Sequence, residues 1–281
     1  MKSKPESESG IQTIRDVIDH RADTQPDIAF LISPETGRHM HTLDAAISKP
    51  KSSEINPGPG FRIKRNFTRP APENVARLRD FPTPDISDVM NRLYTMDPGI
   101  KNVVNQERIF APACTVKVFP GDNLMVHKAL DVAQPGDVIV VDAGGSSLNG
   151  VLGDLISTKA KHRGIVAFVI DGLMRDVDGV KEIEVPVFAR GVTPIGPLHR
   201  GPGEINFSVC CGGIVVRPGD VICGDANGVV VVPQEFLEEL LTRLEKQKHT
   251  MREYEQNVRR GKFSNQWVDD ALNQLNCFWV D

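Results

Sequence analysis

The sequence lacks the long apolar runs and the basic blocks that would place the chain in a membrane or on nucleic acid. Its longest uninterrupted apolar run has six residues, 165–170, whereas a membrane-spanning helix needs about 20. No cluster of Lys and Arg stands out, and the formal net charge is −4. The first nine residues contain no apolar segment of the secretory-signal type. We therefore expect a cytoplasmic protein that binds neither membrane nor nucleic acid.

Cysteine is also scarce, and its pattern fits neither a disulfide framework nor a zinc site. The five cysteines are odd in number and contain no C-x-x-C pair. We therefore expect reduced thiols. The rest of the composition, with 40% hydrophobic and 25% charged residues, is ordinary for a globular protein. A chain of 281 residues can bury a full core, which favours one large domain with appendages.

Changes in composition divide the chain into four segments. In order, we expect a disordered tail over 1–10, an N-terminal extension and linker arm over 11–72, a main domain over 73–233, and a C-terminal helix and tail over 234–281. Residues 11–47 resemble the first helix and strand of adenylate-forming acyl-CoA ligases, but nothing later supplies the nucleotide-binding loop of such enzymes. We therefore interpret this extension as an appendage without ligase chemistry.

Strand and helix patterns alternate through the middle of the main domain. The expected elements are a strand over 138–142, a helix over 154–163, a strand over 165–170, a helix over 176–183 and a strand over 185–188. This alternation predicts an α/β fold with a parallel segment and right-handed crossovers. Three Pro-Gly-Asp turns accompany the strands, and their aspartates, Asp122, Asp137 and Asp220, are expected to bond local backbone N–H groups.

Two acidic loops frame one of these crossovers. Asp154 begins the predicted helix, and Arg175 and Asp176 follow the next strand in a loop over 171–176, with twenty residues between Asp154 and Arg175. In parallel sheets, ligands bind beyond the carboxyl ends of the strands. The four N–H groups from Gly153 to Ile156 are expected to be free, because the first turn of a helix leaves its donors unpaired, and they suit a substrate carboxylate. We therefore expect a site for an anionic substrate here.

The carboxylates of this site, with no histidine over 164–198, favour a hard cation over zinc. Mg²⁺ or Mn²⁺ takes carboxylate and water, often through one or two protein groups. The alternative interpretations are structural. Arg175 and Asp176 taken alone are more typical of a surface salt bridge or helix cap, and Asp154 alone could complement the helix dipole.

Together these residues resemble the 4-hydroxy-4-methyl-2-oxoglutarate aldolase family. That family also includes the regulator of ribonuclease activity A and proteins once labelled dimethylmenaquinone methyltransferases. The matching residues are Gly153-Asp154-Leu155-Ile156 and Arg175-Asp176, supported by matches at 83–88, 121–123, 169–172, 188–191, 218–220 and 224–229.

The resemblance implies a three-layer β/β/α swivelling-type fold and a class II, metal-dependent pyruvate aldolase. By position, Asp176 is the implied metal ligand, Asp154 binds metal-bound water, Arg175 contacts the 2-keto acid, and the backbone of Gly153, Asp154, Leu155 and Ile156 holds its carboxylate. Arg175 and Asp154 are thus the implied catalytic residues. Oxaloacetate decarboxylation, which passes through the same pyruvate enolate, is an expected side activity. The resemblance also implies homotrimers or dimers of trimers.

Other residues and other functions remain open at this stage. His127, His199, Glu204 and Asn206 are further candidates, and the loop 199–204 could recognise the distal part of the substrate. A non-catalytic regulator that binds a protein is the alternative function. A methyltransferase would need a Gly-rich loop between a first strand and helix, which 142–147 imitates only in part.

Overall fold

The computed structural model describes residues 54–280. The predicted disordered tail over 1–10 and the helix and strand expected within 11–47 lie outside the described residues. Within the described part, the chain forms one compact unit from Ile55 onward. All five thiols are free, as expected. No helix between residues 54 and 280 is both long and apolar enough to cross a membrane.

A mixed sheet forms the centre of the unit. Its strands, in spatial order, are β1 (Phe61–Ile63), β7 (Gly203–Ile205), β3 (Ile109–Val118), β4 (Val138–Asp142), β5 (Ala167–Met174), β6 (Val187–Val192) and β2 (Lys101–Val104). Strands β3 to β6 run parallel to one another, which confirms the predicted parallel segment. The edge strand β1 comes from the predicted linker arm and pairs with β7.

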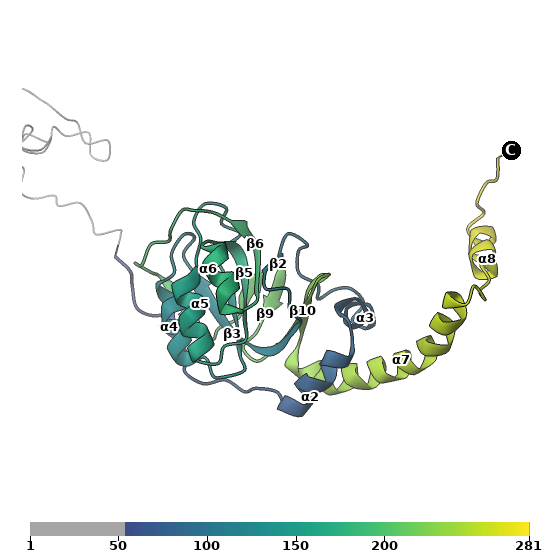
Figure 1. Ribbon diagram of the computed structural model, residues 1–281, viewed down its shortest axis with the longest axis horizontal. Coiled ribbons are helices and arrows are strands. Elements are labelled where there is room, and N and C mark those ends of the chain that lie inside the picture. The colour runs from purple at the N-terminus through teal and green to yellow at the C-terminus, as the bar shows by residue number, and fades with distance from the viewer. Residues whose placement is uncertain (1–53, 281) are drawn as a thin grey trace, which may run out of the picture. The chain divides into compact units, whose positions relative to one another are not determined.

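Three helices cover one face of this sheet (Figure 1). They are α4 (Leu124–Val132), α5 (Asp154–His162) and α6 (Val177–Ile183). Side chains alternate along a strand, so every second residue of each strand points toward these helices. Ile139 and Val141 of β4, with Phe168 and Ile170 of β5, are buried in this first core.

A second β layer covers the other face. It consists of β8 (Val209–Cys211), β9 (Ile214–Val216), β10 (Val221–Asp225) and β11 (Gly228–Val232). The intervening residues of the central strands, such as Val140 and Val169, pack against Ile222 and Val231 of this layer in a second core. Strand β3 joins the layers because its first half pairs with β10 and its second half with β4.

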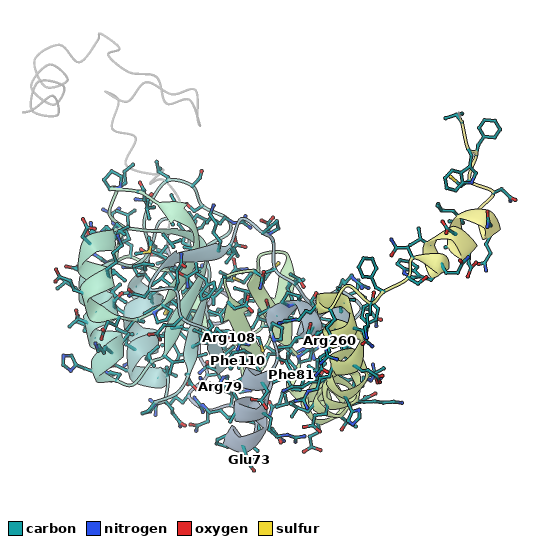
Figure 2. The ribbon with its side chains drawn as sticks, turned by 45° about the vertical axis from the view of Figure 1, so that its right-hand side comes forward. Glu73, Arg79, Phe81, Arg108, Phe110 and Arg260 are labelled. Atoms are coloured by element: carbon teal, nitrogen blue, oxygen red, sulfur yellow. The ribbon has the colours of Figure 1, made fainter. Side chains whose placement is uncertain are left out.

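An outer helical layer packs on β10 and β11. It contains α2 (Pro72–Arg77), the 3₁₀ turn η1 (Leu78–Asp80), α3 (Thr83–Val89), the 3₁₀ turn η2 (Gln234–Phe236) and the first half of α7 (Leu237–Arg259). Arg108 fastens η1 to the start of β3, since its guanidinium donates to the carbonyl oxygens of Arg79 and Phe81 and lies 4.9 Å from the Phe110 ring centroid (Figure 2). The predicted β/β/α arrangement is thus confirmed, with this helical layer added.

The C-terminal helices are buried only at their beginning. The buried residues of α7 all lie in its first third, at Leu237, Leu240, Leu241 and Leu244. The following helix α8 (Gln266–Gln274) has no buried residue. The long C-terminal helix predicted from residue 234 is therefore confirmed, and its distal part extends away from the core (Figure 1).

The structure also bears on two details of the sequence analysis. The aspartates of the three Pro-Gly-Asp turns accept local N–H groups, from Leu124 to Asp122, Gln134 to Asp137, and Arg217 to Asp220, which confirms their structural role. The predicted acidic loop over 171–176 is wrong, because β5 continues to Met174. Asp171 can occupy a buried strand position because Arg190 and the Gly212 N–H satisfy its carboxylate.

Candidate active site

A pocket of about 270 Å³ opens beyond the carboxyl ends of the parallel strands. It is lined by Asn123, His127, Leu152, Gly153, Asp154, Leu155, Ile156, Arg175, Asp176, Gly196, Pro197 and His199. All six residues that the sequence analysis placed in the site therefore line one pocket. The two elements predicted to supply them, the start of α5 and the segment after β5, converge there.

Three glycines bring the backbone of neighbouring segments close to the charged side chains. A Cβ atom added at Gly153 would clash with the carboxylate of Asp176. One added at Gly196 would lie 2.6 Å from the Arg175 guanidinium, and one at Gly179 would lie 2.9 Å from the Cβ of Asp154. Gly179 and Gly196 carry no motif of their own, so sequence reasoning missed them.

Asp176 has an unusual backbone conformation. It lies at the N-cap position of α6 with φ 57° and ψ 43°, in the left-handed region, and its side chain makes no capping hydrogen bond. Such a conformation is uncommon for a residue other than glycine and costs on the order of 1 kcal/mol or more. Oδ2 of Asp176 instead lies 3.1 Å from Nε of Arg175, and both side chains are about two-fifths exposed. The salt bridge considered from sequence thus exists, whereas the helix cap does not.

The start of α5 forms the opposite wall of the pocket. Gly153 occupies the N-cap position, and Asp154 is the first residue of the helix. The N–H of Leu155 donates to Oδ1 of Asp154 over 2.7 Å, so this donor is engaged within the helix start. The expectation that all four N–H groups from Gly153 to Ile156 are free is therefore wrong for Leu155. Helix geometry still leaves the other first-turn donors without partners in the helix.

A buried asparagine orients one of the two pocket histidines. Asn123 is 2% exposed, and its Nδ2 donates to the carbonyl oxygen of Val151. Its Oδ1 must then accept a hydrogen bond from the Nδ1–H of His199, over 2.6 Å. Nε2 is then the ring nitrogen of His199 that is left available to a ligand. Asn123 was noted in sequence only as part of the 121–123 match.

His127, on α4, lies beside His199, and 5.6 Å separates the two ring centroids. Burial, and then the charges of Lys159 and His199, lower the pKa of His127. A neutral ring beside a polar pocket is suited to accept or donate a hydrogen bond. The structure thus places His127 and His199, two of the four further candidates from the sequence, in the pocket.

The other two of these further candidates, Glu204 and Asn206, do not line the pocket. Oε1 of Glu204 accepts hydrogen bonds from Nε of Arg62 and from the Gly60 N–H. Nδ2 of Asn206 donates to the carbonyl oxygen of Lys64. Both residues therefore hold the arm that carries β1 against the sheet.

The donor set can be compared with the needs of a metal ion. Within residues 54–280, no three His, Cys, Asp or Glu side chains group closely enough to hold a metal by themselves. A tetrahedral zinc site needs such a group, whereas Mg²⁺ keeps several waters and is often held by one or two carboxylates. The accessible carboxylate of Asp176, with Asp154 on the same pocket, fits the second case.

The chain is similar to several known proteins. A family model described as RraA-like (Aldolase/RraA) matches residues 83–231. A protein of Halalkalibacterium halodurans named "Putative 4-hydroxy-4-methyl-2-oxoglutarate aldolase" is 41% identical over 172 residues, which are 61% of this chain and 82% of that protein.

Two solved structures show the same fold. An uncharacterised protein from Pseudomonas syringae pv. tomato superposes with a TM-score of 0.62 and 28% identity, over 70% of this chain and 97% of that one. Streptomyces coelicolor RraAS2, described as an unusual member of the RNase ES inhibitor RraA protein family, superposes with a TM-score of 0.60 and 27% identity. That match covers 69% of this chain and 99% of RraAS2.

Proposed function

Because the chain belongs to the RraA-like family of aldolases and RraA proteins, we propose that it is a divalent-metal-dependent lyase. Its substrate class is a 4-hydroxy-2-keto acid, which it cleaves to release pyruvate. Asp176 is the proposed metal ligand, for Mg²⁺ or Mn²⁺, and Asp154 binds water on that metal. Oxaloacetate decarboxylation is the proposed side activity, and the proposed assembly is a homotrimer or a dimer of trimers.

One observation carries this proposal. The Asp176 carboxylate is held in a left-handed backbone conformation, makes no helix cap, and lies against the N-cap glycine of α5 in the same pocket as Arg175. Backbone strain that serves no capping role is typical of functional positions. A surface salt bridge alone would not require the Gly153 backbone to approach the carboxylate so closely.

The residues of the pocket can perform the parts that this chemistry requires. A bound divalent metal withdraws electrons from the carbonyl of a 2-keto acid. Arg175 adds positive charge where negative charge develops on the carbonyl oxygen. The first-turn N–H groups of α5 suit the substrate carboxylate. Nε2 of His199 is available to the distal part of the substrate.

The test is pyruvate release by the purified chain. With Mg²⁺ or Mn²⁺, we expect pyruvate from a panel of 4-hydroxy-2-keto acids or from oxaloacetate, and EDTA should abolish its release. Asp176→Ala should lose activity by roughly 10²-fold or more. Asp178→Ala is the matched control, because Asp178 lies two residues further in α6 and is fully exposed. Full activity in Asp176→Ala would overturn the metal assignment.

A non-catalytic regulator is the second candidate, favoured by the likeness to RraAS2. It predicts that no keto acid turns over with any divalent metal and that the chain binds a ribonuclease with micromolar or better affinity. An intact Asp154, Arg175 and Asp176 set in one pocket favours the lyase. The two functions are separated by the same turnover assay, run beside a direct binding measurement.

A further inference from the structure

Four charged side chains form a row across the central sheet. The backbone register places Lys117 of β3 beside Asp142 of β4, and Asp142 beside Asp171 of β5. Arg190 of β6 follows, because Ile170 pairs with the neighbouring Ala189. The row therefore reads positive, negative, negative, positive across four adjacent parallel strands. These charges belong to none of the groups that line the pocket.

The two aspartates are buried, so they need partners. Asp142 is 4% exposed and Asp171 is 6% exposed. Oδ2 of Asp142 accepts from Nζ of Lys117 over 3.2 Å and from the Cys210 N–H over 3.3 Å. Oδ1 of Asp171 pairs with Nε of Arg190, and Oδ2 accepts the Gly212 N–H over 2.8 Å. Since a buried charge without a partner is strongly destabilising, both ends of the row are required.

Asp171 also lies in a β-bulge. Between Ile170 and Leu173, β5 advances three residues while its partner β6 advances only two. Bulges bend a strand and redirect the side chains that follow, and they are common beside active sites. The carbonyl oxygen of Asp171 accepts the Gly145 N–H, so the bulge is also tied to the loop after β4.

Few residues separate this bulge from the pocket, and backbone hydrogen bonds connect them to neighbouring segments. The N–H of Val151 donates to the carbonyl oxygen of Leu173 over 2.9 Å, and the N–H of Arg175 donates to the carbonyl oxygen of Leu152 over 3.0 Å. Leu152 immediately precedes Gly153, and Arg175 immediately precedes Asp176. Backbone hydrogen bonds thus connect the strand after the bulge to both walls of the pocket.

We propose that the Asp171–Arg190 ion pair is a positioning device for the pocket, which fixes Arg175 and Asp176 against the start of α5. Neither residue lines the pocket. What the pocket does rests on the function proposed above, whereas the geometric link does not.

The chain offers a matched control in a second buried ion pair. Arg69 donates to Asp137 through Nε over 2.8 Å and through a terminal nitrogen over 2.6 Å. Asp137 is fully buried and precedes β4, at the opposite end of the sheet from the pocket. Arg69→Gln should therefore cost stability as Arg190→Gln does, without a path to the pocket.

The experiment compares wild type with Arg190→Gln, Arg190→Lys and Arg69→Gln by backbone hydrogen exchange and by pyruvate release. In Arg190→Gln we expect faster exchange in peptides 150–157 and 172–178, and a fall in kcat/KM of roughly 10- to 100-fold, mainly in kcat. Arg190→Lys should restore much of both. In Arg69→Gln, faster exchange should be confined to residues near 134–138 and 164–166, with kcat close to wild type.

Two results would overturn the positioning role. One is wild-type exchange in both pocket peptides of Arg190→Gln; the other is an equal effect of Arg69→Gln on those peptides. The exchange arm needs no turnover. If wild type releases no pyruvate, the proposed function fails, and the exchange comparison alone decides the positioning role.

Discussion

At the scale of single residues, the site depends on how closely backbone approaches side chain. Gly153, Gly179 and Gly196 each lie against one charged side chain of the pocket, so the space that they leave open is part of the site. Sequence motifs indicate the charged residues but not their glycine neighbours, which come from other segments.

Gly153→Ala tests this close approach. Its backbone, with φ −148°, is open to any residue, so the effect of the added methyl is steric. We expect kcat/KM to fall by at least roughly 10-fold, because the methyl displaces the Asp176 carboxylate. Unfolding should become easier by only about 1 kcal/mol, since the pocket rim can relax. Gly191→Ala is the control, because its methyl would meet Leu173 at an ordinary 3.4 Å. Wild-type kinetics in Gly153→Ala would contradict the assignment.

His127 gives a prediction about pH. Burial lowers its pKa below the ordinary value of 6.5, so the folded state resists a proton that the unfolded chain accepts. The contribution of neutral His127 to the free energy of unfolding is therefore fully present above pH 6.5 and is lost as the pH falls below that value. Urea unfolding between pH 8 and pH 5 should show a weaker pH dependence in His127→Gln than in wild type. His249→Gln, on an exposed position of α7, should match wild type. Parallel curves for wild type and His127→Gln would refute the prediction.

The candidate site was predictable in part. Asp154, Arg175 and Asp176 follow from the rule that ligands bind at the carboxyl ends of parallel strands, and they do line one pocket. The rule says nothing about side chains from distant loops. His199 enters the pocket because Asn123 bonds its ring, whereas Glu204, five residues later, pairs with Arg62. No local pattern distinguishes these two outcomes.

At the scale of elements, one carboxylate joins the outer helical layer to the second β layer. Asp225 ends β10, and its two oxygens accept the N–H and the hydroxyl of Thr83 at the start of α3, over 2.9 Å and 2.7 Å. Burial raises the pKa of Asp225, but hydrogen bonds from Thr83 and Asn227 outweigh burial and lower this pKa below its ordinary value. The ionised carboxylate thus stabilises the helix start.

Asp225→Asn should weaken this connection in a pH-dependent way. Because the folded pKa is depressed, the stabilisation is present above the ordinary value of 3.8 and is lost as the pH falls through the lower folded value. We expect a loss of about 1 to 3 kcal/mol in unfolding free energy at pH 7, typical of hydrogen bonds to a charged group. Near pH 3 the difference from wild type should shrink. A difference that is constant with pH, measured by urea unfolding, would show that charge is not the cause.

Element boundaries were predicted best where polarity changes abruptly. The strand over 138–142 was found at its predicted bounds, since Asp137 turns the chain before it and Gly144 follows it closely. β5 was underestimated because Asp171 and Gly172 resemble a loop, and only their tertiary partners let the strand continue. The sequence of one strand alone does not predict such a buried ion pair, because the partner residue lies in another strand.

At the scale of the whole molecule, the C-terminal region divides into a part that stabilises the fold and a part that does not. Four leucines in the first third of α7 belong to the outer core. Helix α8 buries nothing, although Trp267 and Trp279 lie in or near it, exposed by 67% and 69%.

Truncation after Gly261 should therefore leave the unfolding free energy of the chain within about 0.5 kcal/mol of wild type. Truncation after Pro233, which also removes the α7 leucines, should abolish cooperative unfolding, because each buried leucine contributes about 1.5 to 3 kcal/mol. Thermal unfolding followed by circular dichroism, at one low protein concentration, compares the two. A large loss in the shorter deletion would mean that α8 has a binding surface on the folded chain.

The layered architecture was only partly predictable from sequence. The continuous β-branched run over 138–141 is typical of a strand buried on both faces, and the structure places its two faces in different cores. The outer helical layer combines residues near 75 with residues near 240, and nothing local in either segment indicates that they meet.

Strand β3 has a consequence for how the chain folds during synthesis. Its first half finds its partner only when β10 emerges, more than a hundred residues later. Until then the nascent chain carries helices α4 to α6 on one face of the sheet, while the layer on the opposite face still lacks β10 and β11. Long-range pairing of this kind slows folding and leaves apolar strands open to aggregation. The incomplete second β layer therefore makes synthesis the stage at which this chain is most exposed to aggregation.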